Sequence, residues 1–94
     1  MSRASVIGIL RDFRGQVERS TEVVHTTWSS RAEALQAIDD VAGLVESGPN
    51  GPGAVRALVA PTGDLQELAI ANGWGDAFLV LAARLERAIE ATEN

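Results

Sequence analysis

The fold of this chain depends on how residues 55–72 are interpreted. They read Val55-Arg56-Ala57-Leu58-Val59-Ala60, then Pro61-Thr62-Gly63-Asp64, then Leu65-Gln66-Glu67-Leu68-Ala69-Ile70-Ala71-Asn72. Two short apolar segments on either side of a Pro/Gly/Asp turn are typical of a β-hairpin. The alternative is a pair of short helices, because Ala, Leu, Gln and Glu favour helix and Asp64 with Glu67 has the spacing of a capping box. We favour the hairpin, since helices of only two turns are marginal on their own.

Residues Glu22–Trp28 present a similar choice. Thr21, Val23, Val24, Thr26 and Thr27 are β-branched, and such side chains lose freedom in a helix and pack well on a sheet. The segment therefore predicts a strand. The alternative is a helix that continues the preceding apolar stripe through Val24 to Trp28.

Three longer segments have the three-and-four spacing of amphipathic helices. The first covers Arg3–Arg19, with Arg14 and Glu18 four residues apart, where they can pair. The second follows a capping box, Ser30 with Glu33, and ends at Gly48-Pro49. The third is capped by Asp76. Its predicted inward stripe is Phe78, Leu81, Ala82, Leu85 and Ile89.

These elements predict one α+β domain over residues 1–94, in the order helix, strand, helix, strand, strand, helix. Its sheet would have three strands, mostly antiparallel, with the helices on one face. Residues 48–53, Gly-Pro-Asn-Gly-Pro-Gly, are expected to form a mobile loop within this domain. If both strand assignments fail, the chain is an all-α bundle.

Composition excludes several kinds of chemistry. The 94 residues contain no cysteine, and all eight basic residues are arginine, so disulfides, thiolate zinc sites and lysine-dependent mechanisms are absent. The net charge is −5. Residues 1–31 hold five arginines against three carboxylates, and residues 32–94 hold three against ten. We expect a cytoplasmic protein with no signal peptide, no membrane segment and no nucleic-acid partner. Nucleic-acid binding through the arginines of the first helix is the less favoured alternative.

The sequence offers no convincing catalytic set. His25 is the only histidine. A serine–histidine–aspartate arrangement would have to use Ser29 or Ser30 with Asp39 or Asp40, but the serines are expected to cap a helix and no nucleophile-elbow motif is present. Adjacent aspartates on a helix point about 100° apart and cannot close on one ion. We therefore predict no enzymatic activity, no cofactor and no metal site.

Trp28 and Trp74 are the candidate partner-binding residues. Each lies where a predicted strand gives way to a helix, and tryptophan is enriched among residues that dominate binding energy in interfaces. A one-sided sheet also leaves a face and an edge to cover. The sequence thus predicts a small acidic protein that acts by protein–protein contact, is a homodimer and could mask a basic protein partner. The alternative is a small-molecule-binding protein or minor enzyme, with a pocket between sheet and helices lined by Trp28, Trp74 and His25.

Overall fold

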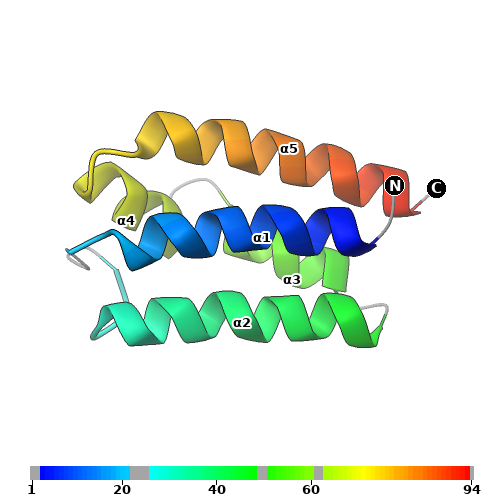
Figure 1. Cartoon of the computed structure of the whole chain (residues 1–94), viewed down its shortest axis with the longest axis horizontal. Helices are drawn as coiled ribbons and strands as arrows, with labels where there is room; N and C mark the ends of the chain where they lie inside the picture. The colour runs from blue at the N-terminus through cyan, green and yellow to red at the C-terminus, as the bar shows by residue number, and fades with distance from the viewer. Residues whose placement is uncertain (1–2, 22–25, 49–50, 61–62, 94) are drawn as a thin grey trace.

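The computed structural model describes residues 3–21, 26–48, 51–60 and 63–93, and these contain five helices and no strand. The helices are α1 (Arg3–Glu18), α2 (Arg31–Ser47), α3 (Gly51–Leu58), α4 (Asp64–Ala71) and α5 (Gly75–Glu93). In Figure 1, α1 lies between α2 and α5 and runs antiparallel to both, and the short helices α3 and α4 lie behind it. The predicted α+β fold with a three-stranded sheet is therefore wrong, and the all-α alternative describes the chain.

The first predicted hairpin strand is α3, and burial shows why. Val55 and Val59 are buried four residues apart, whereas Ala57 between them is exposed. A half-buried strand would have placed all three on one face, since its side chains alternate with a period of two. The four-residue spacing instead suits a helical turn: Val59, just after the end of α3, donates its amide to the Val55 carbonyl at 3.2 Å, and α3 packs against α2.

The second predicted hairpin strand is α4. Its buried side chains, Leu65, Leu68 and Ala69, have helical spacing and are fully enclosed. A two-turn helix is marginal in water, but tertiary packing of an apolar face supplies the stability that an isolated helix lacks. The predicted capping box is not formed, because Gly63 is the N-cap and Asp64 is the first helical residue. The Asp64 carboxylate instead accepts hydrogen bonds from the backbone and hydroxyl of Thr27.

The predicted strand at residues 22–28 is also incorrect where the structure describes it. Residues 26–28 form a bend, in which the Thr26 hydroxyl accepts a hydrogen bond from the Trp28 amide at 3.3 Å. The helical alternative is not seen either, because α1 ends at Glu18. Residues 22–25, including His25, lie outside the described residues. The amides of Thr27 and Trp28 donate to side-chain oxygens of Asp64 and Thr26, and not to a neighbouring strand.

The start of α2 confirms Ser30 as the predicted N-cap, and Glu33 reaches back as expected but to the preceding amide. The Ser30 hydroxyl accepts a hydrogen bond from the Glu33 amide, and the Glu33 carboxylate reaches back to the amide of Ser29, one residue before the cap. The Glu33 amide, which has no intrahelical partner, and the Ser29 amide before the helix are thus both satisfied. The helix ends at Ser47, with Gly48 as its C-cap, as predicted.

The loop predicted at residues 48–53 is shorter than expected, because α3 already begins at Gly51. Pro52 is tolerated in the first helical turn, where its missing N–H has no intrahelical partner to lose. A Cβ placed on Gly51 would lie 2.7 Å from the Cα of Val45. Glycine at this position therefore lets the start of α3 cross the end of α2 at close range.

The core is built from apolar stripes of the helices, and the stripe predicted for α5 is confirmed except at Ala82, which is only partly buried. From α1 it receives Val6, Ile9, Leu10, Phe13 and Val17, and from α5 Phe78, Leu81, Leu85 and Ile89. The ring of Phe13 packs against Phe78 with centroids 5.7 Å apart and against Trp74 at 6.5 Å. These edge-to-face and tilted contacts are favoured arrangements of aromatic pairs. They join the middle of α1 to the start of α5.

Candidate interaction surface

The outward side of α5 exposes large apolar side chains. Leu79 and Val80 are 57% and 60% exposed, and Ile70 at the end of α4 is 58% exposed. A Cβ placed on Gly75 would lie 3.4 Å from Cγ1 of Ile70, and Leu79 is one turn beyond Gly75 on the same face. Ile70, Leu79, Val80 and the exposed Ala83 therefore form one apolar area, which we call the α5 outer face.

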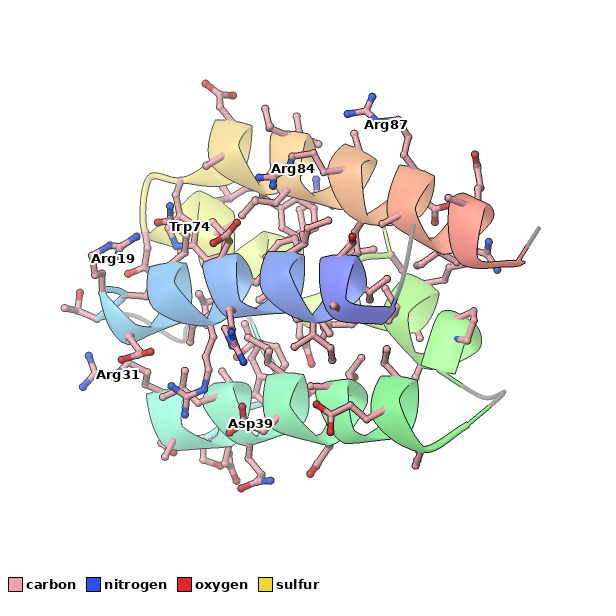
Figure 2. All side chains as sticks on the ribbon, turned by 45° about the vertical axis from the view of Figure 1, so that its right-hand side comes forward. Arg19, Arg31, Asp39, Trp74, Arg84 and Arg87 are labelled. Carbon is pink, nitrogen blue, oxygen red and sulfur yellow. The ribbon has the colours of Figure 1, made fainter. Side chains whose placement is uncertain are left out.

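Charged side chains flank the α5 outer face. Asp76 precedes the apolar residues by one turn and Arg87 follows them by one turn, and both are exposed. Neither forms an ion pair with a residue in the described part of the chain. Figure 2 shows Arg87 pointing away from the bundle above α5. Arg84 behaves differently, because it pairs with Asp12 of α1 at 3.6 Å.

Arginines also line the groove between α1 and α5. It contains two hollows of about 540 and 600 Å³. Their lining includes Arg11, Arg19, Arg84 and Arg87, with Asp12 as the one carboxylate. The groove is therefore basic on a chain whose net charge is −5. Such local charge of the opposite sign affects which partners approach this side and how fast they do so.

Trp74 is a core residue in this structure. The chain leaves α4 through a Schellman motif, in which the Gly73 amide donates to the Ile70 carbonyl at 3.2 Å and the Trp74 amide to the Ala69 carbonyl at 2.9 Å. Gly73 has φ +82°, a left-handed conformation that favours glycine. The turn directs the indole of Trp74 inward, where it is 9% exposed.

A buried hydrogen-bond chain holds that indole. Nε1 of Trp74 donates to the hydroxyl of Ser20 at 2.9 Å, and the hydroxyl donates to the Gln16 carbonyl at 2.9 Å. Next to it, the Thr21 amide donates to the side-chain oxygen of Asn72 at 2.9 Å. The end of α1 and the α4–α5 turn are therefore fastened together by polar contacts as well as apolar ones.

Trp28 lies elsewhere and is half-buried. It lines a hollow of about 380 Å³ between α2 and α3, whose other lining residues are Ala37, Val41, Ala54, Ala57, Leu58, Asp64 and Leu65. Trp74 is not part of that lining. The pocket predicted between a sheet and helices has no sheet to form it in the described residues. Partner binding through Trp28 and Trp74 stays a prediction, and of the two only Trp28 is partly accessible here.

The residues considered for catalysis serve structural roles where they are described. Ser30 caps α2, and Asp39 accepts a hydrogen bond from Arg14 at 2.9 Å. His25 lies outside the described residues. Among the residues described, no group of three or more histidine, cysteine or acidic side chains could hold a metal ion.

Arg14 links α1 to α2 by charge. Its guanidinium contacts Asp39 at 2.9 Å and Glu18 at 2.8 Å, which confirms the predicted pairing with Glu18. The hydrogen bond to Asp39 and its charge raise the pKa of Arg14 above its ordinary value. Arg31 has a related role, since it donates to the carbonyls of Glu18 and Ser20 at 3.0 and 3.2 Å. A cation at this end of α1 complements the helix dipole.

The α5 outer face was not among the sites predicted from the sequence. The signal was present in the unbroken apolar run Ala77–Ala83, which is too long to fit on the inward stripe alone. In a helix such a run surrounds the axis, so Leu79, Val80 and Ala83 have to point away from Phe78 and Leu81.

None of the helices in the described ranges combines the length and apolar character that a membrane crossing requires. The chain matches no protein-family model, no curated protein and no solved structure. Its function therefore has to be inferred from its own surface.

Proposed function

We propose that this protein acts without catalysis, by binding protein through the α5 outer face. The observation that carries the proposal is the exposure of Ile70, Leu79 and Val80, each with more than half of its residue surface in water. Scattered exposed apolar residues are normal in small proteins. A contiguous apolar area with a charged rim is typical of an interaction site.

Two further features support a binding role. Trp74 and Ser20 are buried and hydrogen-bonded to each other, and Ser30 caps α2, so these three residues stabilise the fold. The α5 outer face, by contrast, has no packing role in the chain as described. A cytoplasmic location and a homodimeric state belong to this proposal. So does a basic protein partner, which would meet the exposed carboxylates of α2.

The test compares two matched variants with the wild-type chain. Leu79→Ser removes an exposed leucine from the α5 outer face, and Leu44→Ser removes one from α2, where 43% of the side chain is exposed. Tagged wild-type and variant chains are incubated with lysate of the native cell, and bound proteins are identified by mass. Circular dichroism verifies that all chains stay helical.

We expect wild type and Leu44→Ser to retain one stoichiometric protein, either a second copy or a different chain, and Leu79→Ser to lose it. Equal retention by both variants, or no stoichiometric protein on any chain, contradicts the proposal. Repeating the capture at higher salt tests the basic partner, since binding through exposed charges weakens as salt screens them.

A further inference from the structure

We propose that the α5 outer face binds a second copy of itself, with the two α5 helices antiparallel. This inference rests on the proposed function and names the partner. It comes from the order of charged and apolar residues between Asp76 and Arg87 of α5, because a second α5 in the reverse direction places each of these two charges opposite one of the other sign.

The exposed residues of α5 follow the spacing of a helix–helix seam. Asp76, Val80, Ala83, Arg87 and Glu90 are all exposed and succeed one another at steps of four, three, four and three residues. At about 100° per residue this spacing keeps them in one narrow line, opposite the buried line through Phe78 and Leu85. The same alternation of steps forms the contact seam of helices that pack at about 20°.

The charges of these exposed α5 residues determine the orientation of the second copy. Asp76 and Arg87 have their midpoint between Leu81 and Ala82, and Val80 and Ala83 have the same midpoint. A two-fold axis through that point sets Asp76 of each chain opposite Arg87 of the partner and Val80 of each chain opposite Ala83 of the partner. Every contact then occurs twice, as an isologous interface requires.

A parallel arrangement lacks this complementarity. It would set Asp76 against Asp76 and Arg87 against Arg87, and like charges at a seam destabilise it. In the antiparallel arrangement each end of the apolar centre has one pair of opposite charges, Asp76 of one chain and Arg87 of the other. The carboxylate of Asp76 and the guanidinium of Arg87 are available for these contacts, because neither forms an ion pair with the described residues of its own chain.

Leu79 and Arg84 lie beside the seam and share its midpoint. They lie on opposite flanks of the seam, about 140° apart around α5, so in the antiparallel pair Leu79 packs beside Leu79 of the partner, while Asp12 holds Arg84 towards α1 and offsets its charge. The contact uses one helix from each chain, which puts it at the small end of interface sizes. We therefore expect a dissociation constant of roughly micromolar or weaker.

Charge reversal tests the register directly. Asp76→Arg puts two arginines opposite each other at both ends of a self-pair, and Arg87→Asp does the same with two aspartates. In a mixture of the two variants, the two cations on α5 of one chain lie opposite the two carboxylates on α5 of the other, so both ends become attractive. Asp40→Arg on α2 is the matched control, since this position is exposed and lies outside α5 and outside the groove between α1 and α5.

The measurement is sedimentation equilibrium of the full chain, with native mass spectrometry to identify the pairs. We expect each α5 variant to raise the self-dissociation constant about tenfold or more. An equimolar mixture should form heterodimers at least as strongly as wild type forms homodimers, while the control behaves like wild type. Because Asp76→Arg places a cation at a helix N-terminus, Asp76→Asn is measured beside it and should give an intermediate loss.

Two results overturn the inference: a wild-type chain that stays monomeric, or variants whose mixture does not pair. If Leu79→Ser nevertheless loses a different protein from lysate, the α5 outer face binds protein and only the self-pairing is wrong. If Leu79→Ser loses nothing, the proposed function fails as well.

Discussion

The contact between Ser20 and Trp74 lets the fold be tested at one buried polar group. Ser20 and Trp74 are both buried, and the indole N–H of Trp74 has the Ser20 hydroxyl as its acceptor at 2.9 Å. Ser20→Ala leaves that N–H enclosed without an acceptor, which costs about 2 kcal/mol. The Gln16 carbonyl is less affected, because it also accepts from the Arg19 amide at 3.2 Å. For a domain of this size we expect Tm to fall by roughly 10 °C.

A double-mutant cycle isolates this effect. Trp74→Phe keeps a ring in the core and removes the N–H, so Ser20→Ala in that background should cost well under about 1 kcal/mol. Urea denaturation of the four chains, followed by circular dichroism, measures the coupling between the two positions. Ser29→Ala is the control, because Ser29 is exposed and the bond it makes to Glu33 uses its backbone amide. If Ser20→Ala costs the same free energy with Trp74 as with phenylalanine, the hydrogen bond does not stabilise the fold and the reasoning is refuted.

Two further substitutions test the helix junctions. Gly51→Ala should destabilise by about 1–3 kcal/mol, since its Cβ would lie 2.7 Å from the Cα of Val45 and the crossing of α2 and α3 would have to open. Gly53→Ala, with no atom within 4 Å of the added Cβ, should be neutral or slightly stabilising in the same urea titration, and equal losses at both glycines would contradict the close crossing. Ser30→Ala should cost about 1 kcal/mol by removing the N-cap acceptor of the Glu33 amide, measured as a drop in Tm. An unchanged Tm would show that the cap does not hold α2.

The sequence predicted well wherever one periodic face was long enough to identify the element. The helices α1, α2 and α5 were predicted correctly because the apolar spacing of each repeats over four or five turns, and the N-cap at Ser30 marked one boundary. Residues 55–72 were misread because α3 and α4 have only eight residues each, so a turn between two short apolar segments fits a hairpin equally well. The deciding fact, that Ala57 is exposed between two buried valines, is a property of packing and cannot be seen in the sequence.

The tryptophans show a different limit. Aromatic residues at element junctions are equally suited to a core and to an interface, and only the direction of the side chain separates the two uses. For Trp74 that direction follows from the Schellman motif and the left-handed Gly73, local geometry that Asn72-Gly73 indicates in the sequence. For Trp28 the neighbouring bend depends on Asp64, far away along the chain. Its placement could therefore not be derived from local residues.

The α5 outer face and the core share one helix, which has a consequence for how this chain can change. Phe78 and Leu85 are buried, and substitutions there alter packing that the whole bundle shares. Replacing such a side chain with a much smaller one lowers the free energy of unfolding by several kcal/mol. Outward substitutions at Leu79, Val80 or Arg87 affect exposed side chains and leave the fold intact. Under the proposed function, binding through this face can therefore vary in strength and partner while α5 continues to close the core, because the core and the proposed interface use opposite sides of α5.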